Sequence, residues 1–265
     1  TFHFHNNASQ TSMYFNYGAW RPVKSIIFAS RFNPGPVPYP FDSNGNGFDV
    51  YWKIENYSSH AQQIRMPLSI RGTSFELNPI YGNLILDDYR IIYNSNNLNY
   101  QVYGNNGNHL ILRNQPQGDN TSKIVIHEYS IVEIANAMGG NCFAGGVNIE
   151  KGELWFNANS SINGGIITVG NGNSNTAKVF LNTGTGGLTI NNNIIVPAAS
   201  ADSHIGGLNQ TGTNTYSGDV VLNSSAFLEA WDGGIVNFSG DISGSGNATI
   251  QRVYGSGTGT VQYSG

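Results

Sequence analysis

Oxygen-bearing side chains in a short, glycine-rich segment could bind a calcium ion. Asp42, Asn44 and Asn46 stand at alternate positions, a glycine is the sixth residue of the segment, and Asp49 is the eighth. Calcium prefers several oxygen ligands around a sharp turn, which is how an EF-hand loop begins. The twelfth position is Lys53, where such a loop needs a bidentate glutamate. The segment therefore has two interpretations, a calcium site and a plain Asn-Gly surface turn, and we expect no other cofactor.

The acidic pair Asp87 and Asp88, followed by Arg90, is a second candidate for chemistry. Two carboxyl groups can act as acid and base, or as acid and nucleophile, in glycoside hydrolysis. This pair has no second acidic cluster and no evident catalytic histidine near it in the sequence. A solvated turn is the simpler interpretation, so we predict that the chain is not an enzyme.

Aromatic residues concentrate in the first half of the chain and include Trp20, Tyr39 and Trp52. Exposed aromatic rings surrounded by polar groups are typical of surfaces that bind a glycan or a protein. The same rings could instead pack in the core or in an end cap. Both interpretations stay open, with these three residues as the candidate ligand-binding set.

Composition excludes several classes of function. Only 11% of the residues are charged and the formal net charge is −4, so no basic patch is available to neutralise the phosphates of a nucleic acid. No stretch approaches the roughly 18 apolar residues of a membrane helix. A single cysteine, Cys142, cannot form an internal disulfide. Low charge together with abundant Gly and Asn favours an extracellular or bacterial cell-surface location.

The elements that must position these residues are short strands. Apolar and polar residues alternate in runs of three to six, bounded by Gly, Asn and Ser, which is typical of strands. A motif of an aromatic residue, a small residue and glycine begins at Phe143, Tyr216, Phe238 and Tyr263, and the last three copies are 22 and 25 residues apart. A fixed period of roughly 20–50 residues predicts a solenoid. We therefore expect one coil per unit, with these four aromatic residues stacked in the core.

The repeat also predicts which side chains point inward. Residues 141–149 match residues 214–222 in register, and Leu154 and Phe227 follow both segments at the same distance. The residues expected to point inward are Phe143, Val147, Ile149, Leu154, Tyr216, Val220, Leu222, Phe227, Phe238 and Ile242. A β-sandwich is the alternative fold, because short strands and glycine-rich turns fit it too. Residues 130–139 could also form a short helix capped by Ser130.

Residues 131–265 resemble the autotransporter-associated β-strand repeat, also called the passenger-associated transport repeat, of bacterial surface proteins. The match is carried by residues 141–149 and 214–222, by residues 162–165, and by a linking segment at residues 234–246. The chain departs from the family pattern at Cys142, and at Ser225 where the first copy has Gly152. The resemblance implies a right-handed parallel β-helix that serves as a stalk and has no activity of its own. Parallel β-helices also include polysaccharide lyases and hydrolases, which is the alternative function.

The sequence also predicts how the chain is divided and which partners it has. Residues 1–130 should form an irregular, aromatic-rich β region that supplies the first coils or a cap, and residues 131–265 the regular repeats. The last motif ends at Gly265, so we expect the solenoid to continue into further repeats of the same chain or to dock on a neighbouring subunit. Surface glycans are a further expected partner. We expect no nucleic-acid partner and no membrane span.

Overall fold

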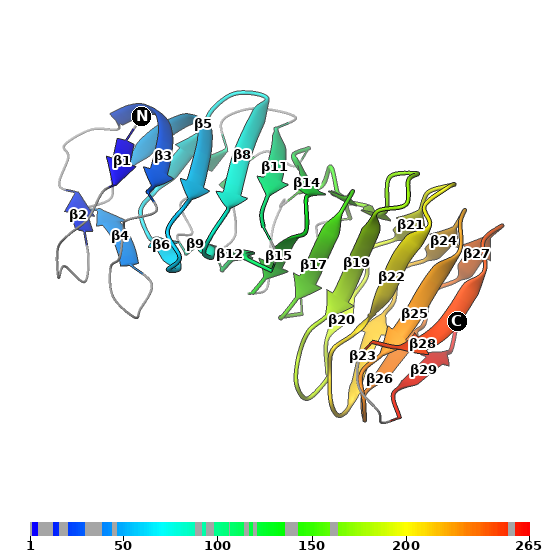
Figure 1. Ribbon diagram of the computed structural model, residues 1–265. Coiled ribbons are helices and arrows are strands. Elements are labelled where there is room, and N and C mark those ends of the chain that lie inside the picture. Colours follow the sequence, from blue (N-terminus) through cyan, green and yellow to red (C-terminus); the bar gives the residue numbers. More distant parts are fainter. Residues whose placement is uncertain are drawn as a thin grey trace.

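The protein is a stack of short parallel strands in a computed structural model (Figure 1). The structure describes residues 2–4, 13–15, 21–29, 39–43, 47–87, 92–93, 98–105, 107–113, 117–118, 121–135, 143–159, 164–253 and 258–265. Within these ranges no residue is helical, and the strand ladders are parallel. The parallel β-helix predicted from the sequence is thereby confirmed, and the β-sandwich alternative is wrong.

Three sheets run along the stack. The 14-stranded sheet contains β1 (Phe2–Phe4), β3 (Arg21–Phe28), β5 (Phe48–Asn56), β7 (Leu68–Ile70), β8 (Ser74–Pro79), β10 (Ile92–Tyr93), β11 (Asn99–Tyr103), β13 (Gln117–Gly118), β14 (Lys123–His127), β16 (Val147–Ile149), β18 (Ile167–Val169), β21 (Ile194–Val196), β24 (Val220–Leu222) and β27 (Ile242–Gly244). The 11-stranded sheet contains β2 (Met13–Phe15), β4 (Tyr39–Ser43), β6 (Gln62–Ile64), β9 (Leu84–Leu86), β12 (His109–Leu112), β15 (Ser130–Ile134), β17 (Gly152–Phe156), β19 (Thr176–Leu181), β22 (Asp202–Gly207), β25 (Ala226–Ala230) and β28 (Ala248–Arg252). The 4-stranded sheet contains β20 (Thr189–Ile190), β23 (Thr213–Tyr216), β26 (Ile235–Phe238) and β29 (Thr260–Tyr263).

Successive coils add strands to these sheets in a fixed order. In the second half, β18, β19 and β20 belong to three different sheets, and β21 then returns to the sheet of β18. In the first half, the long strand β5 pairs with β7 through its first residues and with β8 through its last ones. The 11-stranded sheet passes residue 130 without a break, because β15 pairs with both β12 and β17. Residues Ser130–Ile134 are thus strand, and the helix alternative for them is wrong.

Aliphatic side chains in register fill the interior. One inward-facing column of the 11-stranded sheet reads Leu84, Leu110, Val132, Leu154, Val179, Ile205 and Leu228. All seven are at most 3% exposed. Parallel stacking places like residues about 4.8 Å apart. The column therefore buries nearly all of its apolar surface, which is the main favourable contribution to the fold.

The aromatic stack predicted from the repeat is shorter than expected. Tyr216 and Phe238 stack face to face, with ring centroids 5.1 Å apart and an interplanar angle of 8°. Tyr263 follows Phe238 in register and is 55% exposed, while Ile190 precedes Tyr216. Phe143 is buried elsewhere, with its ring 5.6 Å from that of Tyr100. Its place in the stack was therefore predicted wrongly, because the coils containing Gly165 and Ile190 separate it from Tyr216.

Phe227 also differs from the prediction. It is half-buried on the outer side of β25, and Leu228 takes the inward position in register with Ile205. The cause is one additional residue in the turn, because Gly152 comes three residues after Ile149 but the equivalent Ala226 comes four after Leu222. Since side chains alternate between the two faces of a strand, a shift of one residue turns Phe227 outward. Ile242 is only partly buried, in the last strand of its sheet.

Candidate functional site

The predicted calcium segment lies mostly outside the described part of the chain. Asn44 and Asn46 are outside the described residues, and only the backbone of Asp42 is described, in β4. The carboxylate of Asp49 accepts a hydrogen bond from Arg71 Nε at 3.1 Å and lies 3.1 Å from Arg71 Nη2. Asp49 therefore has an ion-pair partner on the next coil.

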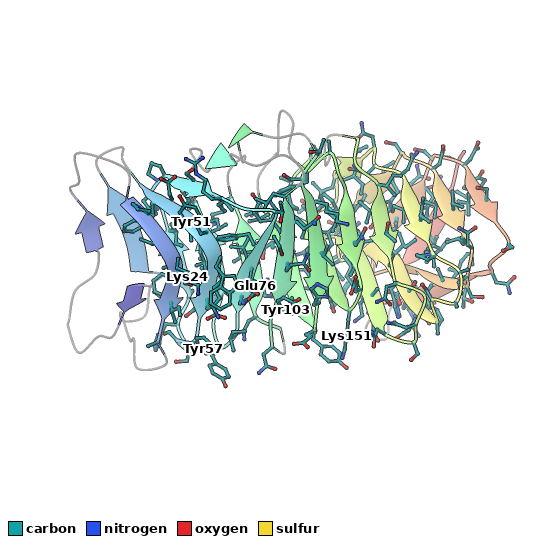
Figure 2. The ribbon with its side chains drawn as sticks, turned by 90° about the horizontal axis from the view of Figure 1, so that it is seen from above. Lys24, Tyr51, Tyr57, Glu76, Tyr103 and Lys151 are labelled. Atoms are coloured by element: carbon teal, nitrogen blue, oxygen red, sulfur yellow. The ribbon has the colours of Figure 1, made fainter. Side chains whose placement is uncertain are left out.

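Of the predicted ligand-binding aromatics, only the side chain of Trp52 is described. Its indole is 41% exposed, and the amino groups of Lys24 and Lys53 lie 4.8 and 4.3 Å from the ring centroid. Trp20 is outside the described residues, and Tyr39 is described only as backbone in β4. Lys24 lies near the N-terminal end of the stack, well away from Lys151 (Figure 2). The predicted grouping of the three residues therefore lies outside the described part of the chain.

The predicted acidic pair is described only at Asp87. Its carboxylate accepts a hydrogen bond from Gln63 Nε2 and lies 3.6 Å from Arg65 Nε and 3.8 Å from Arg113 Nη1. Asp88 lies outside the described residues. Asp87 thus bridges neighbouring coils through basic and amide groups.

The outer face of the 11-stranded sheet carries a polar and aromatic cluster that was not predicted. Alternate residues of its strands point away from the core and form two columns. The first column is His109, Ile131, Glu153, Lys178, His204, Phe227 and Thr249. The second is Ile85, Ile111, Glu133, Trp155, Phe180, Gly206, Glu229 and Gln251. We call this surface the outer face.

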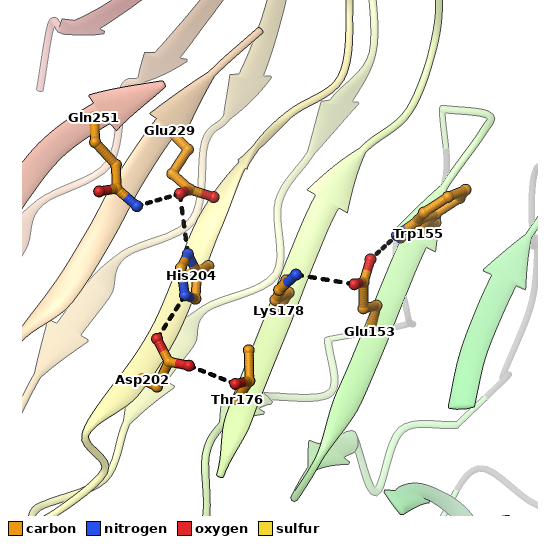
Figure 3. A network of polar contacts seen from close by, with 8 residues as sticks. All are labelled: Glu153, Trp155, Thr176, Lys178, Asp202, His204, Glu229 and Gln251. Carbon is orange, nitrogen blue, oxygen red and sulfur yellow. Dashed lines mark hydrogen bonds and ion pairs between the residues drawn. The ribbon is translucent and has the colours of Figure 1, made fainter. Parts of the chain in front are cut away.

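Glu153 lies at the centre of one contact network on the outer face (Figure 3). Its Oε1 accepts a hydrogen bond from Lys178 Nζ at 3.1 Å, and its Oε2 accepts one from Trp155 Nε1 at 2.8 Å. The indole of Trp155 also meets the His109 ring edge to face, with centroids 5.0 Å apart. These contacts on both sides fix the orientation of the Trp155 side chain.

His204 is the centre of a second network (Figure 3). Its Nε2 lies 2.8 Å from Asp202 Oδ1 and its Nδ1 lies 3.0 Å from Glu229 Oε1. Thr176 donates to the other oxygen of Asp202, and Gln251 Nε2 donates to Glu229 Oε1 at 2.5 Å. The side chain of Glu229 is only 4% exposed, so its negative charge needs a cationic partner. His204 supplies it when protonated.

The two partners of His204 determine its titration. Burial alone would lower the pKa of His204, but hydrogen bonds and charges of Glu229 and Asp202 outweigh burial and raise it above its ordinary value. Burial alone would likewise raise the pKa of Asp202, yet hydrogen bonds from Thr176 and His204 hold it below its usual range. Asp202 and Glu229 thus favour the protonated form of His204.

This network makes stability depend on pH. The folded-state pKa of His204 lies above the ordinary value of 6.5, so its contribution is complete below pH 6.5 and is lost as pH rises through the folded-state pKa. We expect the urea midpoint of the wild type to fall over that interval more than that of His204→Gln. Urea is suitable because it does not screen charges as a salt does. Parallel pH dependence of the two proteins would contradict this assignment.

Two adjoining hollows on the outer face form one groove. One, of about 360 Å³, is lined by Gly107, Tyr129, Ile131, Gly152, Glu153, Thr176 and Lys178. The other, of about 500 Å³, is lined by Ile131, Glu153, Trp155, Phe180, Asn182, Leu208, Gln210 and Trp231. Ile131 and Glu153 line both hollows, so the two lie next to each other, and we call them together the outer groove. Gly206 contributes no side chain between Phe180 and Glu229, and Glu229 packs so closely there that a Cβ would lie 2.5 Å from its carbonyl oxygen.

Comparisons with known proteins add no relative. No protein-family model matches the chain, and neither does any curated protein or solved structure. Among the described residues, no three His, Cys, Asp or Glu side chains gather in a way that could hold a metal ion. No helix in the described ranges is long and apolar enough to cross a membrane.

Proposed function

We propose that this chain is a structural and adhesive segment of a secreted or cell-surface bacterial protein, in which it forms a stalk or part of a fibre. The observation that carries this proposal is that ionic side chains join one coil to the next along the axis of the stack. Lys178 reaches Glu153, and His204 reaches Glu229, each across one step of the same sheet. Such a ladder reinforces the long axis of the solenoid, as a stalk requires.

Side-chain hydrogen bonds from one coil to a carbonyl of the preceding coil support the same role. Asn192 Nδ2 donates to the carbonyl of Gly165 at 2.7 Å, and Ser224 Oγ donates to that of Ser200 at 2.6 Å, in each case on the preceding coil. A hydrogen bond to a buried carbonyl removes a cost of about 1–3 kcal/mol for an unsatisfied group. Each bond therefore resists separation of the coils. The low charge and high Asn and Gly content favour the extracellular location.

The resemblance to autotransporter-associated repeats suggests the partners. Further repeats of the same chain, or neighbouring subunits, would extend the stack, and surface glycans are the ligand class for adhesion. The proposal includes no catalytic step. The alternative function, a polysaccharide lyase or hydrolase, is not favoured by the surroundings of Asp87, because its carboxylate already contacts Arg65 and Gln63.

Two measurements test the proposal. Antibodies against the purified chain should label intact cells of the source organism, because the proposal places the chain outside the cell. The purified chain should release no new reducing ends or unsaturated products from a panel of neutral and acidic polysaccharides.

Each measurement has an outcome that contradicts the proposal. Labelling that requires permeabilised cells would exclude the surface location. Polysaccharide cleavage that disappears in Asp87→Asn, with the far-UV circular dichroism unchanged, would show that the chain is an enzyme and not a structural stalk.

A further inference from the structure

The outer groove has an aromatic lining that spans several coils. Trp155 on β17 and Trp231, which follows β25, both line it and are half-buried, and the buried ring of Phe180 lies between their coils. Three ladder steps separate β17 from β25, which corresponds to about 14 Å across the strands. The groove therefore matches an extended ligand with an apolar face better than a single small molecule.

Hydrogen-bonding side chains stand beside these rings. Asn182 is half-buried and Gln210 is exposed, and each amide offers two donor hydrogens and one acceptor oxygen. Neither amide makes a hydrogen bond to another residue of the described ranges that would occupy it in the fold. Both are thus available to a ligand that carries many hydroxyl groups.

The groove is electrically neutral along its described lining. Glu153 and Lys178 are the charged residues among those that line it, and they are paired with each other at 3.1 Å. An anionic polymer would meet no uncompensated positive charge there. This argues for an uncharged ligand, since charge complementarity usually accompanies recognition of a charged one.

Trp155 is held in place before any ligand arrives. Its Nε1 donates to Glu153, which Lys178 holds from the other side, and its ring meets the ring of His109 edge to face. A fixed ring loses little side-chain entropy on binding, so such a contact favours affinity. Figure 3 shows Glu153 between Trp155, on the same strand, and Lys178, on the adjacent strand.

We infer that the outer groove binds a neutral glycan chain. The apolar C–H faces of its sugar rings stack on Trp155 and Trp231, and its hydroxyl groups bond to Asn182, Gln210 and Glu153. Sites that combine aromatic walls with a few placed polar groups are the usual form of a ligand pocket. This site does not depend on the stalk role, and it lies on a different part of the chain from the aromatic set predicted at Trp20, Tyr39 and Trp52.

Calorimetric titration with neutral oligosaccharides tests the inference. The probes are the hexaoses of cellulose, mannan, xylan and chitin, with oligogalacturonate as the anionic comparison. At least one neutral hexaose should bind, and Trp155→Ala and Trp231→Ala should each weaken it about tenfold or more. The matched control is Tyr263→Ala, an exposed aromatic residue on another sheet, which should bind as the wild type does.

A second variant separates loss of binding from loss of folding. Gln210→Ala removes an exposed amide, so it should weaken binding severalfold while leaving the thermal midpoint unchanged. Absence of binding by every neutral hexaose at about 10 mM would overturn the inference. So would tighter binding of oligogalacturonate, or equal affinities of the wild type, Trp155→Ala and Trp231→Ala. Self-association of the chain that Trp155→Ala abolishes would assign the groove to a second copy instead.

Discussion

Replacing Phe238 with alanine should lower the free energy of unfolding by about 3–5 kcal/mol, the usual cost of removing a buried aromatic ring. Phe238 is 1% exposed and stacks on Tyr216 with ring centroids 5.1 Å apart. The alanine variant leaves a cavity between two coils, which packed strands cannot close without losing their hydrogen bonds. Urea denaturation followed by circular dichroism measures the loss.

Phe227→Ala is the matched control, since it removes the same ring from the opposite face. Phe227 is half-buried and stacks on the ring of His204 with centroids 4.9 Å apart. Its loss should cost about 1 kcal/mol, close to the value of one aromatic contact. Because long repeat arrays need not unfold in one step, amide hydrogen exchange in β23 and β26 should accompany the denaturation curves. Equal losses for the two variants would contradict the assignment of inner and outer faces.

The inward face was largely predictable from the sequence. Strict alternation identified Val147 and Ile149 in one strand and Val220 and Leu222 in another, and all four are at most 2% exposed. The reason is that each of these positions depends only on neighbours within its own strand. The buried position of Tyr216 was also predicted, because the aromatic motif recurs in register in consecutive coils.

Prediction failed where the length of a turn matters. Coil lengths vary between 20 residues, from Val147 to Ile167, and 28 residues, from Ser25 to Lys53. One additional residue reverses inside and outside, as Phe227 shows. The alignment of Ser225 with Gly152 failed for the same reason, since Ala226 is the residue in register with Ser203 of the preceding coil.

The outer face could not be predicted, because its contacts join residues of different coils. His204 and Glu229 are 25 residues apart, and Glu153 and Trp155 belong to a strand that looked like ordinary alternation. A signal did exist, since Glu153, Trp155 and Lys178 are polar or aromatic residues at positions between inward aliphatic ones. It becomes informative only when the register between coils is known.

The second large effect on the free energy of unfolding should come from a buried side-chain amide, that of Asn214. The residue is completely buried in β23. Its Oδ1 accepts a hydrogen bond from Leu188 N at 3.0 Å, and its Nδ2 donates to Leu181 O at 3.1 Å and to Asn209 Oδ1 at 3.0 Å. One side chain thus satisfies a backbone donor and a backbone acceptor that water cannot reach.

Asn214→Leu keeps a similar volume but leaves these groups without partners. Each buried unsatisfied group costs about 1–3 kcal/mol, so we expect the free energy of unfolding to fall by about 3–5 kcal/mol. Asn223→Leu, at an exposed turn position of the next coil, should change it by less than about 0.5 kcal/mol. Urea denaturation and hydrogen exchange at the amide of Leu188 measure both effects. An unchanged exchange rate at Leu188 in Asn214→Leu would show that the hydrogen bond to Asn214 Oδ1 does not protect the Leu188 amide.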